Sequence, residues 1–166
     1  MKKLIAAVAL LSLPLGSIAA DSQDTMFYTE AAQGGMNEVE LGKLAADKGS
    51  TTSVKSFGKQ MVTDHTMANK ELMAIAKQKS VMLSTEPNAE GKATKKTLQG
   101  LTGAAFDRAY IESQVKDHDK TIALLERQIS SGKDADAKAW ATKTLPVVQQ
   151  HAAMVKKMAE GSHQAH

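Results

Sequence analysis

The 166-residue chain has the composition of one ordinary globular domain, with 42% apolar residues and a formal net charge of +3. Aromatic residues make up only 4% of it and its charges of both signs are interspersed, so a nucleic-acid-binding surface is not expected. The chain has no cysteine, which excludes disulfide bonds and a cysteine nucleophile. It also lacks a glycine-rich phosphate loop and a serine in a nucleophile-elbow context.

Residues 1–20 are typical of a secretory signal peptide. They begin with Lys2 and Lys3, continue with an apolar run broken by Pro14, and end in small residues up to Ala20. This run is too short for a stable membrane span. We expect cleavage after Ala20 and a mature chain that begins at Asp21, in the periplasm. Without disulfides in an oxidising compartment, that chain must be stabilised by a packed core or a bound ligand.

Apolar residues then recur every three or four positions in four segments, which predicts four amphipathic helices. The first segment spans 27–45 and ends before Gly49. The second spans 54–75, with hydroxyl side chains at 50–53 as candidate N-caps. The third spans 106–129 and ends at Gly132, and the fourth spans 137–158, capped by Asp134 or Asp136.

The periodicity is lost between Ser80 and Gly103, although residues 92–101 could form a short surface helix. The turns near residues 50 and 132 are short by comparison. The chain is therefore predicted to be all-α: a four-helix bundle of two helical hairpins joined by a long crossover. We assign the bundle to residues 21–160 and a flexible C-terminal tail to 161–166.

One ionisable residue interrupts the apolar stripe of each predicted helix: Glu38, His65, His118 and His151. Counted from the nearest turn at ~1.5 Å per residue, the first three fall within about one helical turn of one another. His151 lies about one turn deeper, and a kink at Pro146 could shift its height. We therefore expect the four side chains to converge in one layer.

A bound cation would explain this layer, because burying an unpaired carboxylate such as Glu38 is costly. Under this hypothesis Glu38, His65, His118 and His151 bind one divalent metal ion, and zinc, manganese and iron are all compatible. The competing interpretation has the histidines as core residues that share hydrogen bonds with Glu38 around trapped water.

An Asp-His pair occurs twice, at Asp64-His65 and at Asp117-His118. Adjacent helical residues point about 100° apart, so neither aspartate can easily orient its own neighbour. Each is instead a candidate to hold the imidazole of the next helix in one tautomer. The alternative is an ordinary salt bridge with a flanking lysine or arginine.

Three further patterns carry less weight. Asn69 and Gln114, four residues from His65 and His118, offer another means of orienting the imidazoles. The methionines of the mature chain are dispersed at helical spacing, which favours core filling over a copper site. A Glu-x-x-His match near the C-terminus is interrupted by Gly161, which we expect to end the last helix.

Four stretches, "EVELGKLA", "VKSFGKQMVTDHTMANKEL", "FDRAYIESQVKDHDK" and "LPVVQQHAAMV", resemble the exported bacterial domain of unknown function numbered 4142. The resemblance covers residues 25–158 and implies a ferritin-like four-helix bundle. Members of that family are often labelled as outer-membrane or exported proteins. The matching positions are Glu38, Asp64, His65, Asp107, Asp117, His118 and His151.

A ferritin-type di-iron centre does not follow from this resemblance. It would require glutamates on two helices and Glu-x-x-His on the other two. Here the residue three positions before each of the histidines is a valine: Val62, Val115 and Val148. A mononuclear site of three histidines and one glutamate fits better.

Two function classes remain after this reading. The first is a periplasmic metal-binding protein, with modest catalysis as a lesser option. The second is a non-catalytic structural, stress-related or interaction protein of the cell envelope that binds no metal, whose histidines are core residues or a pH-sensitive latch. Such a protein would have an envelope partner that the sequence does not identify. We expect no transmembrane segment in the mature chain.

Overall fold

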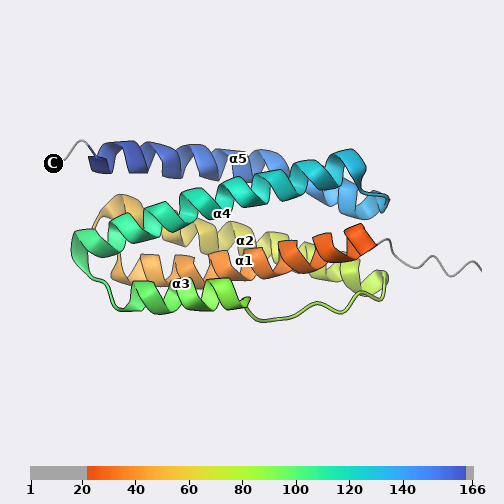
Figure 1. Cartoon of the computed structure of the whole chain (residues 1–166), viewed down its shortest axis with the longest axis horizontal. Coiled ribbons are helices and arrows are strands. Elements are labelled where there is room, and N and C mark those ends of the chain that lie inside the picture. Colours follow the sequence, from red (N-terminus) through yellow and green to blue (C-terminus); the bar gives the residue numbers. More distant parts are fainter. Residues whose placement is uncertain (1–21, 164–166) are drawn as a thin grey trace, which may run out of the picture.

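The computed structural model describes residues 22–163, which form five helices and no strand (Figure 1). The helices are α1 (Ser22–Lys48), α2 (Thr52–Gln78), α3 (Ala89–Gln99), α4 (Gly103–Ser131) and α5 (Ala135–His163). The all-α prediction is confirmed. The predicted signal peptide at 1–20 lies outside the described residues. Within the described part, no helix is both long and apolar enough to cross a membrane.

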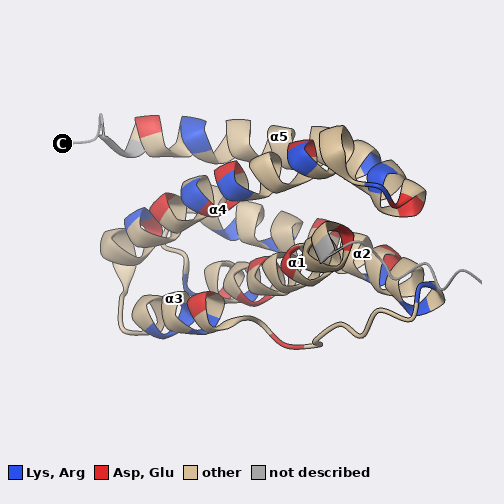
Figure 2. Ribbon diagram, turned by 45° about the vertical axis from the view of Figure 1, so that its right-hand side comes forward, with Lys and Arg blue, Asp and Glu red and all other residues tan. Residues whose placement is uncertain are grey.

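The four long helices pair as two hairpins, α1 with α2 and α4 with α5. Smaller contacts between α1 and α4, and between α2 and α5, complete the bundle. The short helix α3 lies within the predicted crossover and packs on α1 and α4 (Figure 1). Figure 2 shows basic and acidic residues mixed along the long helices.

Polar side chains fix where several helices begin. Thr51 caps α2 by accepting the amide N–H of Val54, and Asp134 caps α5 by accepting those of Asp136 and Ala137. At the other end, α5 continues through Gly161 to His163. The helix therefore extends beyond the boundary at residue 160 that the glycine suggested. Residues 164–166 of the expected tail lie outside the described range.

The core consists of two apolar clusters separated by a polar layer. The aromatic members of the first cluster are Phe27, Tyr28 and Trp140, and those of the second are Phe57, Phe106 and Tyr110. Each long helix contributes to both clusters. Between its two contributions each helix carries one of the buried ionisable residues predicted from the sequence: Glu38, His65, His118 and His151.

Buried aspartates tie each hairpin turn to the other hairpin. Asp107 on α4 accepts four hydrogen bonds of 2.7–2.9 Å from the main chains and hydroxyls of Ser50 and Thr51, in the α1–α2 turn. Asp24 on α1 accepts the main-chain N–H groups of Lys133 and Asp134, in the α4–α5 turn. The two hairpins are thus fastened at both ends of the bundle.

We expect Asp107→Ala to lower the free energy of unfolding at neutral pH by about 1–3 kcal/mol, because these hydrogen bonds end on a buried charged group. Burial would raise the pKa of Asp107, but the hydrogen bonds from Ser50 and Thr51 outweigh it and hold the pKa below its ordinary 3.8. Stability from such a group is present above the ordinary pKa and is lost as the pH falls through the lowered value. The difference between wild type and variant should therefore shrink in acid.

Urea denaturation between about pH 7 and pH 2.5 measures both effects. Asp119→Ala is the matched control, since Asp119 is half exposed and pairs with Lys156, at 2.7 Å. Its removal should change stability by less than about 1 kcal/mol at any pH. Equal effects of the two substitutions would show that Asp107 is no more than a surface charge.

Candidate metal centre

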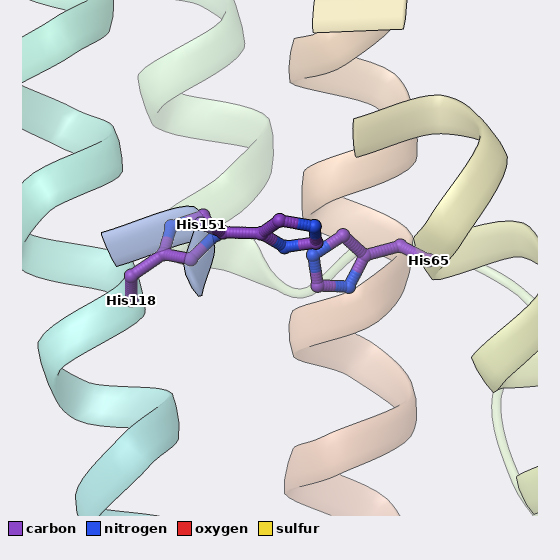
Figure 3. A group of neighbouring side chains, drawn as sticks. All are labelled: His65, His118 and His151. Atoms are coloured by element: carbon purple, nitrogen blue, oxygen red, sulfur yellow. The ribbon is translucent and has the colours of Figure 1, made fainter. Parts of the chain in front are cut away.

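The three histidines of the polar layer meet in the middle of the bundle. His65 comes from α2, His118 from α4 and His151 from α5, and their rings point toward one another (Figure 3). The ring centroids lie 5.6–6.0 Å apart. One nitrogen of each ring can be chosen so that all three lie within 4.8 Å of one another. The side chains are 1–8% exposed, so the group is enclosed by protein.

Hydrogen bonds fix the tautomer of two of these imidazoles. The Nδ1 of His118 lies 2.8 Å from the main-chain carbonyl oxygen of Gln114, which can only accept, so this nitrogen carries the proton. The Nε2 of His151 lies 2.9 Å from a carboxylate oxygen of Asp64 and donates to it. The lone pairs therefore remain on the Nε2 of His118 and the Nδ1 of His151.

These two lone-pair nitrogens and the Nε2 of His65 are all buried without a hydrogen-bond partner within residues 22–163. A buried polar atom without a partner costs about 1–3 kcal/mol. Three such atoms facing one another from three helices could hold a metal ion. The second nitrogens of His118 and His151 are held by a carbonyl and a carboxylate, as those of metal-bound histidines usually are.

The environment keeps the imidazoles neutral. Burial, together with the charges that His118 and His151 would carry, lowers the pKa of His65 to about 3. Burial lowers the pKa of His118 to about 4. It also lowers the pKa of His151, against the opposing effect of Asp64. At neutral pH all three rings are therefore neutral, which is the form that binds metal.

Phe57 covers the histidines on the side of the second apolar cluster. Its ring centroid lies 6.1 Å from that of His118 and 6.4 Å from that of His151. An apolar wall of this kind limits water and strengthens electrostatic interactions inside the site. Phe57 falls within the predicted helical segment 54–75, where its apolar side chain gives no sign of a position beside the histidines.

The two aspartates of the repeated Asp-His pair lie in different places. Asp64 contacts the histidine of another helix, His151, as described above. Asp117 instead borders a pocket between α1, α3 and α4, and no hydrogen bond joins it to any of the three imidazoles within the described residues. Of the two amides considered, Gln114 orients His118, but through its main chain, and Asn69 packs beside Gly35.

Glu38 lies in the polar layer but outside the group of three histidines. It is 4% exposed, and its Oε2 has no hydrogen-bond partner. Burial, reinforced by the charge of Asp117 and opposed by the nearby Gln114 side chain, raises its pKa to about 8. The sequence placed Glu38 at the right height in the bundle, but on α1 it faces α4 and not the centre of the histidine group.

Both the fold and the sequence of this chain are similar to those of known proteins. The fold is similar to a solved structure described as a DUF305 fragment from Deinococcus radiodurans, with a TM-score of 0.74 and 11% sequence identity. That match covers 85% of this chain and 97% of the other. No curated protein matches the sequence. Residues 14–158 match the profile of the family described as domain of unknown function DUF4142, and the chain belongs to that family.

Proposed function

We propose that this protein binds one divalent metal ion through His65, His118 and His151. The observation that carries the proposal is the set of three buried ring nitrogens that face one another without a hydrogen-bond partner among the described residues, two of them with their lone pairs free. His118 and His151 spend their N–H groups on Gln114 and Asp64, so only the Nε2 of His65 could donate within the group, and that one bond would satisfy only one of the other two nitrogens. A cation is the group that satisfies all three nitrogens at once.

The donor set favours zinc among the metals considered from the sequence. Three neutral imidazoles and one open position form a four-coordinate site of the kind zinc adopts. Iron is also compatible with imidazole, whereas manganese prefers oxygen donors. Because Glu38 lies outside the three histidines, we assign it no direct bond to the ion. The open position would hold water, and no substrate is assigned to it.

We further propose that the bundle is ferritin-like and that the protein works in the periplasm, with association at the outer membrane. The signal-peptide pattern of residues 1–20 supports export. Export is also consistent with a metal site. Other exported proteins are often cross-linked by disulfides, and in this chain without cysteine a bound ion would link the helices instead.

The proposal predicts the number of metal ions that each chain holds. Protein purified from the periplasm without an affinity tag should contain close to one metal ion per chain, and His65→Ala/His118→Ala should contain almost none. Adding metal to the metal-free protein at about one hundred times its dissociation constant should raise the free energy of unfolding by about 2.7 kcal/mol. Elemental analysis and thermal unfolding measure the two effects.

The chain supplies its own control, since two of its five histidines lie near the C-terminus. His163→Ala/His166→Ala removes the same number of imidazoles and should leave both results unchanged. Wild-type protein that holds no metal, and that zinc, manganese, iron and copper all fail to stabilise, would refute the proposal. The protein would then be the structural or interaction protein that the sequence allows, and the search would turn to an envelope partner.

The proposal also predicts that the carboxylate of Asp64, which accepts a hydrogen bond from His151, strengthens metal binding. Asp64→Ala should weaken zinc binding about 10–100-fold, because the imidazole loses the partner that fixes its tautomer. Asp64→Asn should recover part of that affinity, since its amide oxygen can still accept from Nε2. The visible spectrum of bound Co²⁺ should keep its three-nitrogen character in both variants.

Asp117→Ala is the control for this prediction, because Asp117 belongs to the equivalent Asp-His pair but does not contact an imidazole. Competition titration with a chromophoric chelator should give it an equilibrium affinity close to that of wild type. If Asp117→Ala weakened zinc binding as much as Asp64→Ala, the loss of affinity would come from the loss of a negative charge. It would then not come from the loss of the hydrogen bond that fixes the tautomer of His151.

A further inference from the structure

The three imidazoles are so well buried that an ion needs a path to reach them. A pocket of about 480 Å³ opens between α1, α4 and the beginning of α3. The charged residues in its lining are Glu30, Glu38, Glu90, Asp117, Lys120 and Arg127. Its mouth is held in shape by α3, which is fixed to α1 through paired hydrogen bonds between Asn37 and Asn88 of 3.1–3.2 Å.

Not all of these carboxylates are available to a cation. Glu90 is already paired with Lys120 at 2.7 Å and with Lys116 at 3.4 Å. Glu30 and Glu38 form no ion pair with any other described residue, and Asp117 forms none within 4.0 Å, although the charges of Lys120 and Lys116 act on it. Among these three pocket-lining residues Glu30 is exposed, Asp117 is partly buried and Glu38 is buried.

Glu38 is the innermost of the three. It lines the pocket and is nonetheless 96% buried, with an unpartnered carboxyl oxygen. Its neighbour Gln114 is fully buried, and the Gln114 side-chain amide lies close enough to Glu38 to oppose the rise of its pKa. The main-chain carbonyl of Gln114 in turn accepts from His118. Buried polar groups therefore lead from Glu38 to the first imidazole.

The opposite side of the bundle offers a less suitable entrance. Asp64 lies between α2 and α5, where its side chain is 26% exposed. One helical turn from Asp64 and from His151, the outer surfaces carry Met67 and Val147, which are 61% and 41% exposed. These apolar side chains do not attract a hydrated cation, and the carboxylates between α2 and α5 already have partners, Asp64 with His151 and Glu71 with Lys143.

We propose that the pocket between α1, α3 and α4 is the entrance for the metal ion, and that Glu38 at its base passes the ion to the imidazoles. This inference rests on the proposed metal function. Glu30 and Asp117 attract the hydrated cation into the pocket. Glu38, which is protonated at neutral pH, then releases its proton to the water of the pocket and replaces part of the ion's water shell with a carboxylate oxygen. The nitrogens of His118, His65 and His151 take over from it. Glu38 is a transfer residue and does not remain bound.

Stopped-flow absorption with Co²⁺ and the metal-free protein tests the route. Glu30→Gln/Asp117→Asn should slow association about tenfold at low ionic strength, the lower end of the range for electrostatic steering, and salt should diminish the effect. Glu38→Gln should also slow association. In both variants the final spectrum should equal that of wild type, because the three nitrogens are untouched. Circular dichroism verifies that each variant is folded.

The matched control removes two carboxylates elsewhere. Glu71→Gln/Asp119→Asn changes the net charge by the same amount, but these residues pair with Lys143 and Lys156 on the outer surface. Its association rate should equal that of wild type. If the pocket variants bound Co²⁺ as fast as the control variant, the proposed route would be overturned. Slow association in Asp64→Asn alone would also overturn it, because the ion would then enter between α2 and α5. An altered final spectrum in Glu38→Gln would make Glu38 a ligand and overturn its transfer role.

Failure of the metal proposal itself looks different in the same experiment. Wild-type protein would then give no Co²⁺ absorption at any time, whereas a wrong route leaves the final absorption intact and changes only which variants are slow.

Discussion

The polar layer between two apolar clusters is the constraint on which the rest of this structure depends. An apolar side chain at any of the three histidine positions would pack without leaving an unpaired nitrogen, and replacing buried polar groups by apolar ones is often neutral or stabilising. The bundle instead keeps three neutral imidazoles whose facing nitrogens lie within 4.8 Å of one another and have no hydrogen-bond partner among the described residues. A bound ion would turn that unfavourable layer into a source of stability, since the free energy of binding would add to that of folding.

The remaining interactions hold the layer in position. Asp107 and Asp24 fasten the turns at opposite ends of the bundle, so the spacing of the helices is set away from the site. Between these ends, α2 and α5 are joined at the level of the site by Asp64 and His151. The histidines thus sit on long helices anchored at both ends, which suits a site whose donors must be placed within a fraction of an ångström.

The helices and the height of the polar layer could be predicted from the sequence, because both follow from the 3.6-residue period and the rise per residue. The rotation of each helix about its own axis could not be predicted from the sequence. His65, His118 and His151 turn toward the centre, whereas Glu38 turns toward the α4 side and its pocket. Asp64 and Asp117 have similar sequence surroundings but different neighbours for the same reason. The role of Asp107 depends on a turn 57 residues away in the chain, which local pattern cannot reveal.

The charge balance of the layer relates the site to the pocket beside it. Three neutral imidazoles leave the full charge of a dication uncompensated in a region of low dielectric, where an isolated charge is costly. Asp64 supplies one negative charge through His151, and on the opposite side the buried carboxyl group of Glu38 could supply a second one by losing its proton. A cation in the layer would then be compensated from both sides, while the neutral donors would select it by geometry. Under the proposed metal function, this division of roles would explain why Glu38 is buried in the same layer without belonging to the group of three histidines.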